Sequence, residues 1–333
     1  MNAAIRPISL TTPFPVGAVN AFLLRDDPVT LVDVGPKLPD AWEGLADGLR
    51  RAGCEWRDIE YVVITHPHVD HHGLLSRVLD ASGATALVHP DAERRVLSPR
   101  LAAESEAMYF EPFLTASGVP EEIRGLIAEH QRLLQEYVDG VDEVKTVEIG
   151  ARLELGGREW RVLDTPGHSS GHLSLFDEEE GDLIAGDHLL PHISSNALLE
   201  APRHPGGERA RSLIVYMEAL NMVAALPVKR VYPGHGEVFT GAAELVDRRL
   251  RGYERRCSQL LGWLGERPHT VFELVRRMFP RLSRGNWFLA VSEIVGHLDV
   301  LQARGQVGIE ERRGLWYYRV EPGREVRSAA QSG

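Results

Sequence analysis

Residues 61–73 contain the feature that most constrains how this chain can fold. Residues 61–64 are apolar and mostly β-branched, which predicts a buried strand. Four histidines and one aspartate follow within residues 66–72, with a proline among them and a glycine after them, so the chain must turn sharply there. Imidazole nitrogens and a carboxylate at this density are typical of a divalent-cation site. Because α/β folds place their sites at strand ends, we favour a metal site over a histidine-rich surface loop.

The length and composition indicate an ordinary globular protein. The chain has 333 residues, more than the roughly 250–300 at which one core stops growing, so we expect one large domain and a smaller one. No apolar run approaches the roughly 20 residues that span a bilayer, and the N-terminus has no signal-peptide pattern. Cys54 and Cys257 form no metal-spaced pair and are expected to be free thiols. We therefore expect a cytoplasmic protein with no membrane partner.

Charge is distributed unevenly along the chain. The formal net charge is −11, which argues against wholesale nucleic-acid binding. Residues 245–333 nevertheless carry 16 Arg against 10 Asp and Glu, a balance of +6. Two interpretations remain open: a solvated helical face, which we favour, or a nucleic-acid contact.

Further polar clusters follow predicted strands. The strand over residues 159–164 leads to His168, a strand over 183–186 leads to Asp187, and a short strand over 230–233 leads to His235. Residues at strand ends can converge on one edge of a sheet even when they are distant in sequence. Asp33 also lies at a predicted strand end, where it either orients a metal-bound histidine or simply makes a turn.

The rest of the chain predicts additional helical parts. Apolar residues at helical spacing over 123–137 predict a long helix inside a helical insert. Near the C-terminus, two predicted helices, the first opening with a capping box at Thr270, and a hairpin form a winged-helix pattern. The predicted domains are a catalytic domain at residues 1–240 with a helical insert at 102–139, a connecting helix at 241–264, a winged-helix domain at 265–322 and a disordered tail at 323–333.

The polar clusters resemble the ordered motifs of a known family. His66-x-His68-x-Asp70-His71, Thr-Pro-Gly-His168, Gly-Asp187 and Pro-Gly-His235-Gly, in this order, are similar to the motifs of the metallo-β-lactamase-fold hydrolases. The resemblance covers roughly residues 20–250. It implies an α/β fold, an αββα sandwich of two sheets with helices outside, and a two-metal site at the shared edge of the sheets.

The resemblance also implies a ligand set. His66, His68 and His168 are similar to the ligands of one metal. Asp70, His71 and His235 are similar to the ligands of the second metal, with Asp187 bridging the two. We expect two divalent cations, zinc first, with iron or manganese as alternatives. A hydroxide bridging the two cations would be the nucleophile, and Asp70 would also be catalytic by accepting a proton after the attack.

Other histidines near these motifs have no place in the ligand pattern. We expect His72 and His172 to orient ligands by hydrogen bonding. His188 and His192 follow Asp187 closely, and each either faces the substrate or packs in the interior.

Three functions compete. The first is hydrolysis of an ester, thioester or lactone of a small molecule, which we favour because the chain has a complete ligand set on an acidic body. The second is a metal-dependent single-strand endoribonuclease, since a metallo-β-lactamase fold followed by a winged helix resembles those enzymes. Against RNA, the candidate recognition helix offers Glu293 and Asp299, a poor phosphate-binding face. We therefore expect the winged helix to pack or to form a homodimer. The third, a DNA-binding regulator with a degenerate sensor domain, conflicts with the intact ligand set.

Overall fold

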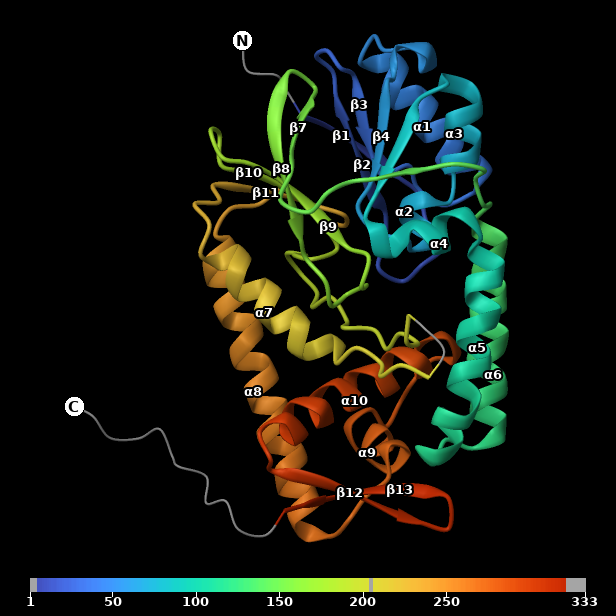
Figure 1. The fold of residues 1–333 in the computed structure, drawn as a ribbon, viewed down its shortest axis with the longest axis vertical. Coiled ribbons are helices and arrows are strands. Elements are labelled where there is room, and N and C mark those ends of the chain that lie inside the picture. Colours follow the sequence, from blue (N-terminus) through green and yellow to red (C-terminus); the bar gives the residue numbers. More distant parts are fainter. Residues whose placement is uncertain (1–4, 204–205, 322–333) are drawn as a thin grey trace, which may run out of the picture.

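Two β-sheets face each other in a computed structural model that describes residues 5–203 and 206–321 (Figure 1). The first sheet has the strand order β1-β2-β3-β4-β5-β6, and the second has the order β11-β10-β9-β8-β7. The strands of the first sheet are β1 (Ile5–Leu10), β2 (Val19–Leu24), β3 (Thr30–Val32), β4 (Tyr61–Ile64), β5 (Thr85–Val88) and β6 (Lys145–Thr146). Those of the second are β7 (Arg152–Leu155), β8 (Arg158–Asp164), β9 (Leu173–Asp177), β10 (Asp182–Gly186) and β11 (Arg230–Pro233).

A hydrophobic core joins the inner faces of the two sheets. Phe22 and Val63 of the first sheet pack with Trp160, Leu175 and Ile184 of the second, and all five side chains are buried. The central strands are apolar on both faces because helices cover the outer face of each sheet.

Helices α1 (Pro39–Arg51) and α3 (Leu75–Ser82) cover the first sheet, and α7 (Ser212–Ala224) covers the second. Each helix buries one apolar side, which includes Leu45 of α1 and Leu220 of α7. The resulting order of layers is helix, sheet, sheet, helix, in agreement with the predicted α/β sandwich.

Further helices occupy the predicted insert and run down one side of the molecule (Figure 1). They are α5 (Pro99–Ala116) and α6 (Glu121–Leu134), followed by the short 3-10 helix η3 (Gln135–Tyr137). The short helix α4 (Glu93–Leu97) lies before the predicted start of the insert at residue 102. Phe110 and Phe113 of α5 contact Phe288 and Trp316, with ring centroids 5.1 and 5.5 Å apart. The insert therefore packs against C-terminal elements.

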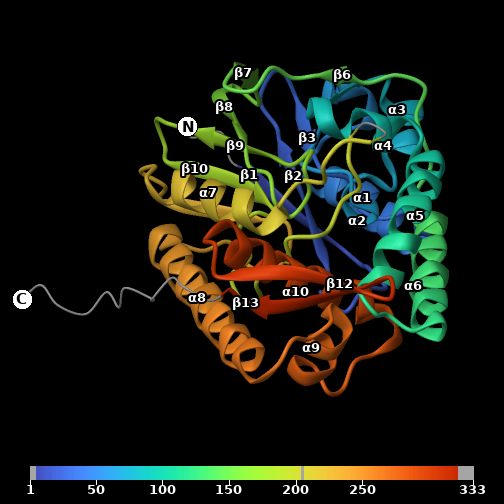
Figure 2. The same ribbon diagram turned by 60° about the horizontal axis from the view of Figure 1, so that its bottom comes forward.

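The C-terminal elements follow the predicted order of helices and hairpin (Figure 2). They are α8 (Ala242–Glu266), α9 (Val271–Met278), η4 (Arg284–Asn286), α10 (Trp287–Ala303), β12 (Val307–Arg312) and β13 (Leu315–Val320). Thr270 forms the predicted capping box with Glu273 at the start of α9. Helix α10 is buried on most sides, in one continuous core with α7 and α8. The predicted tail at 323–333 lies outside the described residues.

The structure also bears on two expectations from the sequence, that no segment spans a membrane and that both cysteines are free thiols. Among the described residues, no helix combines the length and apolar character needed to cross a membrane. Cys54 and Cys257 are both free, buried thiols.

Candidate metal centre

The polar clusters meet where four strands end at one edge of the paired sheets. Strand β4 leads to His66, β8 to His168, β10 to Asp187 and β11 to His235. Helix α2 (Val69–His72) begins directly after His68. All seven residues that the sequence predicted as ligands converge here.

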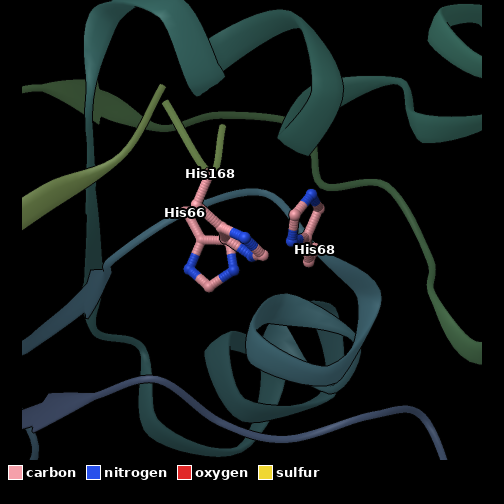
Figure 3. Close-up of side chains that lie close together, drawn as sticks. All are labelled: His66, His68 and His168. Atoms are coloured by element: carbon pink, nitrogen blue, oxygen red, sulfur yellow. The ribbon is translucent and has the colours of Figure 1, made fainter. Parts of the chain in front are cut away.

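Their side chains form three overlapping groups, in each of which the potential ligand atoms lie within 4.8 Å of one another. Figure 3 shows the imidazole rings of the first group close together. The groups are His66, His68 and His168; His66, His71 and Asp187; and Asp70, His71 and His235.

The Asp187 carboxylate lies among the histidines. Its oxygens are 3.4 Å from His71 Nε2, 3.5 Å from His168 Nε2 and 3.6 Å from His235 Nε2. Asp70 is 3.3 Å from His235 Nε2. Asp187 therefore links the histidine group to the group that contains Asp70.

Several buried polar atoms of this centre have no hydrogen-bond partner among the described residues. Leaving such atoms unpaired is costly, so each needs a further partner. Nitrogen and oxygen atoms pointing at a common space fit a divalent cation. The unpaired atoms are Nε2 of His66, His71, His168 and His235, and Oδ1 of Asp187.

The first group is electrostatically suited to neutral imidazoles. Burial and the neighbouring His168 lower the pKa of His68 to about 3. Burial and the neighbouring histidines also hold the pKa of His66 well below its usual range. Burial lowers the pKa of His168 as well, although Asp187 opposes it. All three rings are therefore neutral near pH 7, the state in which imidazole binds metals.

The group formed by Asp70, His71 and His235 favours positive charge. Burial lowers the pKa of His71, but Asp187, Asp33 and Asp70 outweigh it and raise the pKa well above its usual value. The pKa of His235 is also raised, because Asp187 and Asp70 outweigh burial. Carboxylates that hold protons on imidazoles would also stabilise a bound cation, which must displace those protons.

Asp33 supports one predicted ligand in the group that contains Asp70 and, through Thr65, one in the group of three histidines. Its Oδ2 lies 2.8 Å from His71 Nδ1, and it accepts hydrogen bonds of 2.8 Å from both the backbone N–H and the hydroxyl of Thr65. The Thr65 hydroxyl lies 3.0 Å from His66 Nδ1. Asp33 has a φ of 59°, a region that Asp tolerates better than most residues. Thr65 was not among the predicted residues, although its position directly before His66 was a usable signal.

Backbone carbonyls orient other rings. His168 Nδ1 lies 2.9 Å from Asn196 O, and His235 Nδ1 lies 2.8 Å from Ala18 O. A proton on Nδ1 that is donated to a carbonyl leaves Nε2 free to face the centre. His72 makes the same kind of contact, with Nδ1 2.9 Å from His68 O.

The remaining predicted histidines differ in their placement. His172 Nε2 accepts a 3.2 Å hydrogen bond from the Asp187 N–H, and its Nδ1 lies 2.7 Å from Thr165 Oγ1. His188 is fully buried, with its ring 5.3 Å from that of Tyr216, which favours the packing alternative. His192 is exposed near Gly236, at the rim of the centre.

Two further residues brace the loop after His168, and no local sequence signal identified them. Glu200 is buried and accepts hydrogen bonds from the Ser170 N–H at 2.9 Å and the Ser169 hydroxyl at 3.0 Å. Arg95 of α4 forms ion pairs with Glu200 and with Glu106 of α5. The helical insert is thereby tied to the loop that carries His168.

Comparisons with known proteins agree with this geometry. The family model described as "Metallo-beta-lactamase superfamily" matches residues 14–235. The chain is 34% identical over 298 residues to "Probable metallo-hydrolase YqjP" of Bacillus subtilis (strain 168), covering 89% of this chain and 91% of that protein.

Solved structures show the same fold over nearly the whole chain. A metallo-beta-lactamase family protein from Thermus thermophilus has a TM-score of 0.80 at 28% identity, covering 95% of this chain and 98% of the other. A beta-lactamase domain protein from Burkholderia ambifaria has a TM-score of 0.82 at 24% identity, covering 95% and 92%. At 95% coverage, the alignments extend into the C-terminal elements.

Proposed function

The chain belongs to the metallo-beta-lactamase superfamily and is a metal-dependent hydrolase, and on this premise we propose that it uses two divalent cations to hydrolyse an ester, thioester or lactone of a small molecule. The observation that carries the proposal is the set of three overlapping ligand groups joined by Asp187. One cation alone would leave either the histidine group or the Asp70 group without a partner.

The seven ligands divide between two positions. His66, His68 and His168 would hold one cation, Asp70, His71 and His235 the other, and Asp187 would contact both. We propose zinc first, with iron or manganese as alternatives, because mixed imidazole and carboxylate sites accept all three. When bound, the cations supply a Lewis acid for the carbonyl group and activate water near neutral pH.

The residues of the chain supply orientation and proton transfer. Although burial raises the pKa of Asp70, His71 and His235 outweigh it and lower that pKa well below its usual range. Asp70 is therefore ionised near pH 7, so one of its oxygens can accept a proton that the attack releases. His172 holds the backbone of Asp187 in place, and Asp33 fixes the ring of His71.

We also propose that residues 265–322 form a winged-helix domain that packs rather than binds nucleic acid. Glu293 and Asp299 of α10 pair with Arg256 and Arg209, and His297 is buried. A recognition helix needs an exposed face to enter a groove, which α10 lacks. No observation among the described residues favours the endoribonuclease over the small-molecule hydrolase.

An assay panel tests this proposal. The metal-loaded protein would be incubated with 4-nitrophenyl acetate, a glutathione thioester, a homoserine lactone and single-stranded RNA, each with and without a chelator. We expect turnover of at least one of the first three substrates that the chelator abolishes. Chelator-sensitive cleavage of RNA alone would overturn the proposal.

A further inference from the structure

A cavity on helix α8 is lined by four arginines and lies outside the metal centre. It has a volume of about 460 Å³, a size typical of small-molecule sites. No carboxylate is among its lining residues, although the chain as a whole carries a net charge of −11. The lining residues are Ser194, Arg248, Arg249, Gly252, Tyr253, Arg255, Arg256 and Gln259.

The four arginines differ in whether their guanidinium groups already have hydrogen-bond or ion-pair partners. Arg249 donates hydrogen bonds to the backbone carbonyls of Leu190 and Ile193, and Arg256 pairs with Glu293. Neither Arg248 nor Arg255 has a carboxylate within ion-pair distance among residues 5–203 and 206–321. Two guanidinium groups therefore face the cavity without a counter-charge.

Neutral donors complete the lining. The Tyr253 hydroxyl lies 3.1 Å from the Ser194 hydroxyl, and Gln259 adds an amide. A lining of guanidinium, hydroxyl and amide groups suits an anion with several oxygens, and guanidinium groups match the geometry of phosphate in particular.

The cavity borders the segment that supports the metal centre. Arg249 holds the carbonyls of Leu190 and Ile193, and Ser195, next to the lining residue Ser194, donates to the carbonyl of Asp187. The Asn196 carbonyl in the same segment accepts from His168. A ligand in the cavity would thus lie across this segment from the metal ligands.

We propose that this arginine cavity binds the phosphate group of a phosphorylated small-molecule substrate, whose scissile acyl bond reaches the metal centre. The substrate assignment rests on the proposed hydrolase function, whereas phosphate binding does not. A small molecule fits better than RNA because the lining arginines span only residues 248–256 and the whole chain has a net charge of −11.

The first arm of the test measures phosphate binding directly. Inorganic phosphate is titrated calorimetrically into the metal-loaded wild type, the R248Q/R255Q variant and the R50Q/R57Q control. The control removes the same charge from side chains that are 75% and 79% exposed on other elements. Any phosphate bound at the metals contributes equally to all three proteins. We expect R248Q/R255Q to weaken the cavity binding about tenfold or more, with the control unchanged. Equal binding in all three proteins overturns the proposal.

The second arm separates substrate recognition from a site for free phosphate. Hydrolysis of 4-nitrophenyl acetate and of an acetyl thioester of a phosphorylated thiol is compared in the same proteins. We expect R248Q/R255Q to raise KM about tenfold for the phosphorylated thioester only, with kcat within about twofold. An unchanged KM assigns the cavity to free phosphate and overturns the substrate role.

Two further outcomes separate a failure of the hydrolase proposal from a failure of the phosphate-site proposal. If neither substrate is hydrolysed but phosphate binding depends on Arg248 and Arg255, the hydrolase proposal fails while the phosphate site stands. If single-stranded RNA binds through these arginines with an affinity that grows with its length, the small-molecule assignment is overturned.

Discussion

Gly234 shows how tightly single residues control the geometry of the metal centre. A Cβ atom at this position would lie 2.2 Å from Asp187 Oδ1 and 2.8 Å from His71 Cε1. We expect Gly234→Ala to displace the Asp187 carboxylate and to lower activity at least about 100-fold, because a misplaced catalytic group can cost that much. Steady-state kinetics and metal analysis of the folded variant measure the effect.

Gly125→Ala is the matched control for this change. A Cβ at Gly125, in helix α6, meets no atom within 4 Å. The control should keep full activity and gain slightly in stability, because Ala favours helices. Full activity of Gly234→Ala would mean that the position of the Asp187 carboxylate does not matter to the reaction.

Asp33 allows a test of ligand orientation without a backbone change. Asn tolerates the positive φ of this position, so Asp33→Asn removes the carboxylate charge and replaces one acceptor oxygen by an N–H donor while the backbone is kept. We expect the affinity for the metal held by His71 to fall about 10–100-fold, because such supporting carboxylates orient the ring and strengthen its binding. A competition titration with a chromophoric chelator measures the change, and an unaltered affinity would show that Asp33 only makes a turn.

The predicted ligands could be identified from the sequence more readily than the residues that hold them in place. The seven predicted ligand residues lie in short motifs directly after strands, so their chemistry and order were visible. Glu200 and Arg95 act through contacts between distant segments, and a lone Glu or Arg carries no such signal. Thr65 stands directly before His66, but its contact with Asp33 joins segments that are distant in sequence. His188 follows Asp187 in the sequence, yet it turns into the core beside Tyr216.

At the scale of elements, the Arg95–Glu200 pair makes the stability of the His168 loop depend on pH. Burial raises the pKa of Glu200, but Arg95 and Ser170 outweigh it and lower that pKa to about 2 from an ordinary 4.5. A depressed pKa contributes stability that is present above about pH 4.5 and is lost as the pH falls toward 2.

The variant Glu200→Gln tests this dependence because glutamine mimics the uncharged carboxyl group. We expect it to lower the free energy of unfolding by on the order of 3 kcal/mol at pH 7, and the difference from wild type to shrink as the pH falls from 4.5 toward 2. Urea unfolding of metal-free protein across this range measures it. Glu159→Gln, on a side chain that is 55% exposed, is the control. A difference that does not change with pH would contradict the role of the charge.

The ends of helices and strands could be predicted where the local sequence carries a clear start or stop signal. Strands β4 and β11 have the bounds that the sequence predicted for them, and the capping box at Thr270 marks the start of α9. Helix α5 was harder to predict, because it contains Pro112 and makes contacts with both α6 and the C-terminal hairpin, which weakens its periodicity.

At the scale of the whole molecule, helix α10 connects the C-terminal elements to the metal centre. It packs in the same core as α7 and α8, and its Leu289 carbonyl and Ser292 hydroxyl bond the segment at Asn196 and Leu199. Sequence patterns do not show such packing, because they report each helix separately.

We therefore expect a chain that ends at Glu266 to fold poorly and to lose its metal. Each large apolar side chain that α10 buries contributes about 1.5–3 kcal/mol, and several of them together exceed a typical stability of about 5–15 kcal/mol. Thermal unfolding and metal content of the truncated chain measure this. Cooperative unfolding with full metal content would show instead that the C-terminal elements form an independent unit.

The metal content of the purified, metal-replete chain tests the proposed two-metal centre most directly, when it is measured by elemental analysis together with that of His68→Ala and His235→Ala. We predict two metal ions per wild-type chain and about one in each variant, because His68 and His235 belong to different groups of predicted ligands. One ion or none in the wild type, or no loss in either variant, would contradict it.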